Sequence, residues 1–378
     1  MAIALALSLL FVALGYFRIV SLVDAAQFVQ KIDFSDTLLH GMLAFLLFAG
    51  ALHIDLEDLK SQALPVVVLS TIGVIIATMI SGSLFWVITQ WLGMGFPFIY
   101  ALLFGALISP TDPIAVLGIL KKAGAPKSLE TKIAGESLFN DGVGVVVFLT
   151  VLGVALGKQQ PDIGHIVTFL LKEAVGGVLL GLILGWLFYR LLKSVDAYQV
   201  EVLLTLALAA GGYSLAEAIH VSAPITIVVA GLFIGNHGRA FGMSDTTRDH
   251  LDKFWELIDE IMNAVLLVVI GLEFLAIRLE SSYVLITLSA VVIVLVSRFL
   301  SVSLLVTTMK PVQTFSKGVV TILTWGGLRG GISIALALSL PAVPERNLII
   351  AATYIVVVFS ILVQGLTISK VIAKLAIQ

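Results

Sequence analysis

The sequence predicts an all-α, polytopic membrane protein of about twelve transmembrane helices, with an inverted repeat and two broken helices, spans 4 and 11. Of its 378 residues, 59% are apolar and only 12% are charged, and the mean hydropathy is +1.11. Apolar stretches of roughly 20 residues, the length that crosses a bilayer, follow one another along the chain. Because a soluble domain carries about 25% charged residues, this composition disfavours a soluble enzyme.

Charge, cysteine usage and the first residues narrow the class further. The net charge is −2 with no basic block, so no nucleic-acid partner is expected. The chain has no cysteine, which excludes disulfides and thiolate metal sites. Residues 1–18 lack a basic leader and a small-residue cleavage site, and they predict a retained first helix rather than a signal peptide. The longest polar interval, 236–253, is interpreted as a loop, so no soluble domain is expected.

Polar, proline and glycine breaks divide the apolar chain into spans. The short pair 198–219 and 221–237 is divided at His220. Most of the 22 Lys and Arg residues fall in even-numbered connections or at the C-terminus, which places both termini in the cytoplasm. The expected spans lie near 2–22, 35–53, 63–91, 97–121, 131–156, 164–193, 198–219, 221–237, 254–276, 282–309, 315–341 and 346–375.

The fourth span contains Pro110-Thr111-Asp112-Pro113 in its middle. A proline lacks the N–H donor and disfavours helix in the residue before it, so the helix should break here. Broken backbone at membrane depth is stable only where protein buries it or where it lines a wet cavity. Asp112 would then begin the second half-helix, where the helix dipole favours a negative charge. The alternative interpretation is a proline kink with a solvated Asp112.

The fifth span contains four polar residues at helical spacing. Glu136 and Asn140 are four residues apart, as are Ser137 and Asp141, so they form two adjacent ridges on one side. Ionisable groups at this depth are costly and are functional candidates by default. Their oxygen atoms suit an alkali cation or a proton rather than a soft transition metal. The alternative interpretation is a polar contact between helices.

The eleventh span contains Gly326-Gly327-Leu328-Arg329-Gly330-Gly331, a second weak point in an apolar helix. Arg329 is expected near the C-terminus of the first half-helix, where its charge would compensate the dipole. The alternative is close packing at the glycines with a snorkelling Arg329. Because spans 4 and 11 cross the membrane in opposite directions, spans 3–5 are expected to pair with spans 10–12 as an inverted repeat.

Arg298, in the tenth span, is the expected counter-ion of a buried acid. We predict a structural ion pair with Glu136 that leaves Asp141 without a fixed cation, although the residues alone do not decide between Glu136 and Asp112. The remaining polar groups are interpreted as structural. Glu256, Asp259 and Glu260 are expected at the membrane interface, Glu201, Glu217 and His220 as solvated groups near span ends, and Gly177, Gly181 and Gly185 as a helix-packing ridge.

These motifs together resemble the sodium/proton antiporters of the NhaP and sodium–hydrogen exchanger type. The resemblance rests on Thr111-Asp112-Pro113, on residues 136–142 (ESLFNDG) and on residues 326–330 (GGLRG). Residues 49–55 (AGALHID) and 255–273, with Asn263, also fit. The resemblance implies a homodimer with a six-helix transport core near 63–156 and 282–375, in which the two broken helices, spans 4 and 11, are crossed. It also implies a dimerisation part near 1–53 and 198–276. Family members often have thirteen helices and animal members a regulatory tail, so one N-terminal span and that tail are expected to be missing.

The resemblance also implies the roles of the site residues. Asp141 would carry the cation and the proton alternately, while Ser137, Thr111 and Asp112 would help to form the Na⁺ site. Asn140 stands where electrogenic relatives have a second Asp, and it is included among the cation- and proton-binding residues. Glu136 and Arg298 match the structural ion pair of the family. No resident cofactor is expected, because Na⁺ and H⁺ are the transported species.

The predicted function is antiport of Na⁺ or Li⁺ against H⁺ by alternating access, with electroneutral 1:1 exchange. The expected location is the plasma membrane of a bacterium or archaeon, with the lipid bilayer and a second copy as partners. The alternatives are a K⁺/H⁺ antiporter, a sodium-coupled organic-anion symporter and a cation channel. An intramembrane protease that uses Asp112 and Asp141 would leave the second broken helix unexplained.

Overall fold

The structure, a computed structural model, describes residues 41–122, 125–157, 163–273 and 283–375. These residues form helices, and their only β-type pairing is an isolated antiparallel bridge between Asp112 and Leu328. Six of the helical segments are long and apolar enough to cross a membrane. The first expected span, 2–22, and the first part of the second lie outside the described residues. The six segments are Ala63–Trp91, Lys127–Ala155, Ile166–Lys193, Tyr198–Ala218, Val284–Met309 and Arg346–Lys374.

The helices follow the expected spans closely. From the N-terminal side they are α4 (Leu43–Leu52), α5 (Leu56–Ser61), α6 (Ala63–Ser70), α7 (Ile72–Trp91), α8 (Phe98–Ile108), α9 (Ile114–Lys122), α10 (Lys127–Ala155), α11 (Ile163–Lys193), α12 (Tyr198–Ala218) and α13 (Ala223–Phe233). There follow the π-helix η2 (Ile234–Gly238), α14 (Arg239–Gly242), α15 (Asp245–Glu273), α16 (Val284–Met309), α17 (Val319–Trp325), α18 (Gly331–Leu338), α19 (Arg346–Phe359), the π-helix η4 (Ser360–Gln364) and α20 (Gly365–Lys374).

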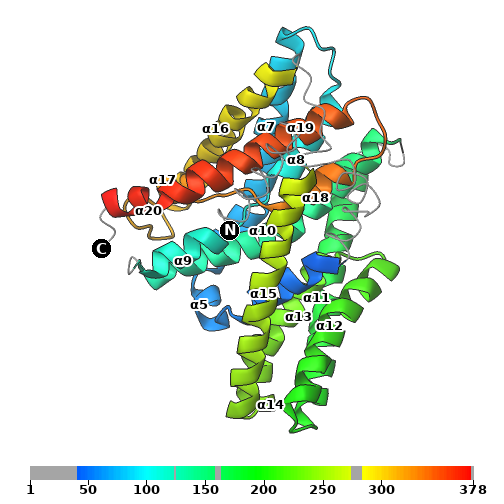
Figure 1. The fold of residues 1–378 in the computed structure, drawn as a ribbon, viewed down its shortest axis with the longest axis vertical. Coiled ribbons are helices and arrows are strands. Elements are labelled where there is room, and N and C mark those ends of the chain that lie inside the picture. The colour runs from blue at the N-terminus through cyan, green and yellow to red at the C-terminus, as the bar shows by residue number, and fades with distance from the viewer. Residues whose placement is uncertain (1–40, 123–124, 158–162, 274–282, 376–378) are drawn as a thin grey trace, which may run out of the picture.

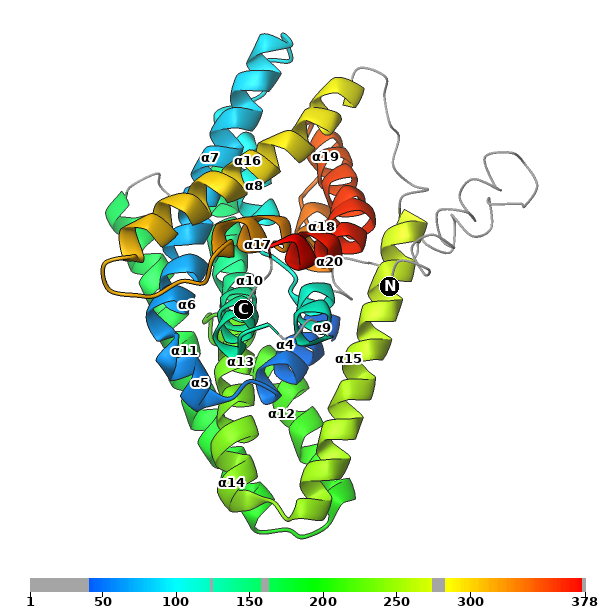
Figure 2. The same cartoon turned by 90° about the vertical axis from the view of Figure 1, so that its left-hand side faces the viewer.

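The helices pack in two groups that meet along α10 (Figures 1 and 2). In one group α7 packs against α8 and α16, and α16 packs against α19. In the other group α13 packs against α4, α11 and α12, while α15 packs against α4 and α12. Helix α10 contacts α6 and α8 on one side and α13 on the other. The segments that carry the predicted polar motifs therefore lie near the middle of the molecule.

Small residues allow the closest helix contacts. A Cβ at Gly82 of α7 would lie 2.9 Å from the Cα of Leu102 in α8, so only glycine permits this approach. On α11, Gly177, Gly181 and Gly185 face Ser222, Thr226 and Phe233, which lie at the start and along the length of α13. The predicted helix-packing ridge on α11 is confirmed by these contacts.

Two spans are broken where the sequence predicts a break. Helix α8 ends at Ile108 and α9 begins at Ile114, with Pro110 and Pro113 in the gap. Helix α17 ends at Trp325 and α18 begins at Gly331, with Gly326, Gly327 and Gly330 in the gap. The two unwound stretches meet, because the Asp112 N–H donates a 2.8 Å hydrogen bond to the Leu328 carbonyl.

The interval 236–253, which was predicted to be a loop, is helical over most of its length. It contains the end of η2, all of α14 and the beginning of α15 at Asp245. The Ser244 hydroxyl accepts a 3.3 Å hydrogen bond from the Thr247 N–H, and Arg248 and Lys253 pair with Asp245 and Asp249 along the helix surface. The prediction was wrong because a polar, charged stretch can form helix where its i,i+3 and i,i+4 ion pairs face water.

The division of the short pair of spans at His220 is confirmed. Helix α12 ends at Ala218 and α13 begins at Ala223. His220 has a φ of 57°, a left-handed conformation that reverses the chain. The Ser222 hydroxyl then caps α13 by accepting a 3.4 Å hydrogen bond from the Ile225 N–H, with Pro224 in the first turn.

Candidate functional site

Arg329, in the break between α17 and α18, binds the end of α8 in the other broken span. Its side chain is buried, and its Nη1 donates to the carbonyls of Ser109 (2.5 Å), Pro110 (3.0 Å) and Ile108. The guanidinium therefore compensates the C-terminal end of α8. The sequence predicts Arg329 at the end of its own half-helix, α17. The difference arises because the bridge between the unwound stretches brings α8 to Arg329.

Glu136 and Arg298 form a buried ion pair. Arg298 Nη1 donates to Glu136 Oε1 at 2.5 Å, and the two residues are 6% and 1% exposed. Arg298 Nε also donates to the Leu323 carbonyl at 3.1 Å, so this one side chain connects α16 with α10 and α17. The structure thus places Arg298 on Glu136 rather than on Asp112, and the charge of Glu136 is neutralised where it lies.

Thr111, Ser137 and Asn140 form a buried hydrogen-bonded group. The Asn140 amide nitrogen donates to Thr111 Oγ1 at 2.8 Å, while Asn140 Oδ1 accepts from the Thr111 N–H at 3.2 Å. The Thr111 and Ser137 hydroxyl oxygens lie 3.1 Å apart. Asn140 therefore attaches the unwound stretch of span 4 to α10. A carboxylate at this position could accept from the Thr111 N–H but could not donate to its hydroxyl.

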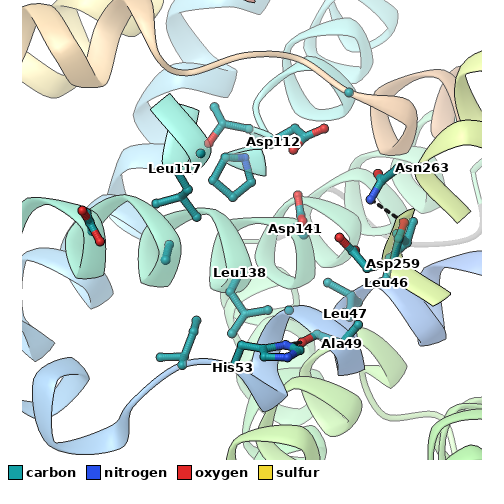
Figure 3. Close-up of a pocket in the computed structure, with 18 of the residues that line it drawn as sticks. Leu46, Leu47, Ala49, His53, Asp112, Leu117, Leu138, Asp141, Asp259 and Asn263 are labelled. Atoms are coloured by element: carbon teal, nitrogen blue, oxygen red, sulfur yellow. Dashed lines mark hydrogen bonds between the residues drawn. The ribbon is translucent and has the colours of Figure 1, made fainter. Parts of the chain in front are cut away.

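Asp141 lies one residue further along α10, at a cavity of about 670 Å³. The carboxylates of Asp112, Asp141 and Asp259 gather in this cavity (Figure 3). Within the part of the chain that the structure describes, no Lys or Arg side chain forms an ion pair with Asp141. Asp141 is thus an acidic group in a cavity at membrane depth, and none of the described Lys or Arg side chains is fixed against it.

The same cavity has an excess of acidic groups along its walls. Its lysine lining residues are Lys121 and Lys127, and His53 also lines it. Lys127 Nζ pairs with Asp58 at 2.6 Å. The N–H groups of Asp58 and Glu57 lower the pKa of Asp55, which keeps this carboxyl ionised. Such a wall attracts cations and repels anions. The other acidic lining residues are Glu130, Asp252 and Glu256.

Asp259 was predicted to be an interfacial residue, but it lines the cavity. Asp252, Glu256, Asp259 and Asn263 recur every three or four residues and face the cavity from one side of α15. The Asn263 amide donates to the Asp259 carbonyl at 2.8 Å. The helical spacing was visible in the sequence. What it could not show is that this face turns toward Asp141 rather than toward the lipid headgroups.

Glu201 was predicted to be solvated near a span end, and this prediction was wrong. The residue is 1% exposed, and its Oε1 accepts a 3.0 Å hydrogen bond from the Thr247 hydroxyl of α15. The first turns of α15 cover it, and those turns were assigned to a loop. His220, by contrast, is exposed as predicted.

Comparisons with known proteins point to one family. The family described as "Sodium/hydrogen exchanger, transmembrane" matches residues 2–374. The chain is 51% identical over 357 residues to the Na(+)/H(+) antiporter NhaP of Pseudomonas aeruginosa, covering 93% of this chain and 84% of that protein. It is 35% identical over 377 residues to the Na(+)/H(+) antiporter NhaH of Halobacillus dabanensis, covering 98% and 91%.

A solved structure has the same fold. The sodium proton antiporter MjNhaP1 of Methanocaldococcus jannaschii superposes with a TM-score of 0.76 at 20% sequence identity. The similarity covers 98% of this chain and 92% of that chain. It shows that the chain shares an all-helical membrane fold with several spans.

Proposed function

The chain belongs to the sodium/hydrogen exchanger family, and from this premise we propose that it exchanges Na⁺ for H⁺ across the cell membrane by alternating access. The protein is an integral membrane protein and a transporter rather than an enzyme. The cargo is assigned from its relatives, because the curated proteins to which it is similar are Na⁺/H⁺ antiporters. We place both termini in the cytoplasm from the distribution of Lys and Arg.

Asp141 is the proposed carrier of both cargoes. The observation that supports this role is its position in an acidic cavity, where no Lys or Arg of the described ranges pairs with it, while the neighbouring Glu136 is neutralised by Arg298. An ionised carboxylate costs about 2.5–3.5 kcal/mol at membrane depth on insertion scales. Binding of either Na⁺ or H⁺ removes that charge. We therefore propose that the protein changes between inward- and outward-facing states only when Asp141 is occupied.

The other site residues divide into ligands and supports. Thr111, Asp112 and Ser137 supply oxygen atoms of the hard type that alkali cations prefer, and we assign them to the Na⁺ site beside Asp141. Asn140 is a support in this proposal, because the oxygen and the nitrogen of its side-chain amide both form hydrogen bonds with Thr111. One shared carboxylate predicts 1:1 exchange that is insensitive to the membrane potential.

The two broken spans are proposed to be corresponding elements of an inverted repeat. Spans 3–5 and 10–12 would form the transport core near 63–156 and 282–375, and the rest would form a scaffold for a homodimer. The bridge between Asp112 and Leu328 supports the pairing of spans 4 and 11. Asp259 lies on α15, which belongs to the proposed scaffold. Its carboxylate would therefore face Asp141 only in the conformation of this structure, in which both residues line the same cavity.

The function is tested by proton release from proteoliposomes after NaCl, LiCl or KCl is added to the purified protein. We expect release with NaCl, no release from Asp141→Asn, and normal release from Asp245→Asn. Asp245 is the matched control, because its side chain is 97% exposed and lies outside the cavity. Sodium-dependent proton release that persists in Asp141→Asn would refute the carrier role. Release with KCl alone would instead identify a K⁺/H⁺ antiporter, and a current that follows imposed voltage would refute electroneutrality.

A further inference from the structure

The last span contains a short π-helix whose polar side chains form hydrogen bonds with a different span. The segment is η4, Ser360–Gln364, between α19 and α20. Ser360 is 0% exposed and Gln364 is 3% exposed. Single π-helical turns inside α-helices are frequent at functional sites, because the extra residue redirects the side chains around it.

Ser360 and Gln364 bind both ends of the unwound stretch between α17 and α18. The Gln364 amide donates to the Trp325 carbonyl at 3.0 Å, and the Arg329 N–H donates to the Ser360 hydroxyl at 2.8 Å. The Ser360 hydroxyl in turn donates to Gln364 Oε1 at 2.9 Å. The Trp325 indole donates to the Thr367 hydroxyl of α20 at 2.9 Å, which adds a second attachment at the same end.

The two backbone groups in this arrangement belong together. In a continuous α-helix the N–H of residue 329 would donate to the carbonyl of residue 325, four positions earlier. The break in span 11 separates these two groups in a buried region where each needs a partner. The two side chains form a relay that runs from Arg329 N–H through Ser360 and Gln364 to the Trp325 carbonyl. The relay thus takes the place of the backbone hydrogen bond that the break removes.

The stretch held by the relay also holds the cation site. Leu328 lies between Trp325 and Arg329, and its carbonyl accepts the Asp112 N–H at 2.8 Å. Thr111 precedes Asp112 and is bonded to Asn140, next to Asp141. A displacement of residues 326–330 is therefore transmitted directly to Asp112 and Thr111. Neither Ser360 nor Gln364 lines the cavity.

We propose that Ser360 and Gln364 are positioning residues that hold span 11 open and set the affinity for the transported cation without touching it. This inference rests on the proposed Na⁺/H⁺ exchange. It specifies how η4, between α19 and α20, takes part, since η4 carries the relay on which the placement of Asp112 depends. Thr353, on the neighbouring helix α19, differs from Ser360 in this respect. Its hydroxyl donates to the Ile349 carbonyl of its own helix at 2.7 Å and makes no contact with span 11 among the hydrogen bonds of the described residues.

The test compares four variants in proteoliposomes. Ser360→Ala and Gln364→Leu each interrupt the relay, Ser360→Thr keeps the hydroxyl, and Thr353→Val removes an equally buried hydroxyl that bonds only its own helix. We expect Ser360→Ala and Gln364→Leu to raise the apparent KM for Na⁺ about fivefold to tenfold, as the loss of one hydrogen bond predicts. The maximal rate should change less, and Ser360→Thr and Thr353→Val should match the parent protein. An unchanged KM in Ser360→Ala and Gln364→Leu would overturn the proposal, as would an equal rise in Thr353→Val.

Amide hydrogen exchange in detergent tests the relay without using transport. The amides of Arg329 and Asp112 should exchange faster in Ser360→Ala than in the parent protein or in Thr353→Val. Unchanged exchange at both amides would overturn the inference. A parent protein that releases no protons on addition of NaCl would refute the proposed function instead, and the exchange data would still report whether the relay holds span 11.

Discussion

The buried pair of Glu136 and Arg298 allows a quantitative prediction. Its partners are 2.5 Å apart and almost fully buried, so their attraction is of order 6 kcal/mol at an effective dielectric constant of about 20. The cost of desolvating the two charges offsets much of this value. A variant that removes one partner leaves the other as an unpaired buried charge and still pays that cost. We expect Glu136→Gln and Arg298→Met each to reduce the free energy of unfolding by about 3–5 kcal/mol.

The double variant separates pairing from simple loss of a residue. Glu136→Gln with Arg298→Met should be more stable than the sum of the single changes by several kcal/mol, because no charge is left unpaired. Arg298→Met also frees the Leu323 carbonyl, so its single effect should be the larger one. The measurement is unfolding of the purified protein in detergent. An exposed pair, Lys253 with Asp249, is the control, and Asp249→Asn should leave the free energy of unfolding nearly unchanged. Strictly additive single effects would refute the reasoning.

Three further predictions concern the candidate site and the acidic cavity around it. Asn140→Asp removes the 2.8 Å donation to Thr111, so the apparent KM for Na⁺ should rise about fivefold, whereas an unchanged KM would show that this bond does not position Thr111. Asp259→Asn should also raise this KM, more at low than at high ionic strength because salt screens the attraction, and Asp245→Asn should not. Asp55→Ala removes the N-terminal cap of α5 and should cost about 1 kcal/mol at pH 7. Because the pKa of folded Asp55 lies below its ordinary 3.8, the charge-dependent part of this stability is present above pH 3.8 and is lost as the pH falls through the folded value. A stability difference that grows on acidification would contradict this assignment.

The breaks in spans 4 and 11 could be predicted because their causes are local. Pro110 and Pro113 remove backbone donors, and the glycines around Arg329 weaken a helix, whatever lies beside them. The cost of an ionisable group in lipid likewise marks Glu136, Asp141 and Arg298 from the sequence alone. These energies are large compared with ordinary packing differences, so they identify the segments that carry the site.

What could not be predicted depends on contacts between distant segments. Ser360 and Gln364 are unremarkable polar residues in an apolar span, and their importance follows from their contact with residues more than thirty positions away. Arg329 was assigned to its own half-helix because the sequence does not show that α8 ends beside it. The burial of Glu201 was missed for a related reason, since the first turns of α15 that cover it were assigned to a loop. In each case the sequence indicates a polar or charged residue at a notable position but does not indicate which distant residue it contacts.

The charges of the broken-helix region suggest why both cargoes can be carried and why an empty carrier should not move. Glu136 and Arg298 neutralise one another, and Arg329 adds one positive charge, with its donors directed at the carbonyls at the end of α8. With Asp112 and Asp141 ionised, these three carboxylates and two guanidinium groups leave one net negative charge. In the proposed exchange, one Na⁺ or one H⁺ at Asp141 would bring the group to neutrality, so the two loaded forms would be alike in charge. Since moving an uncompensated charge through a low-dielectric region is costly, only the loaded forms should change state readily. We therefore propose that this equality of charge, rather than any single contact, underlies the one-for-one exchange inferred above.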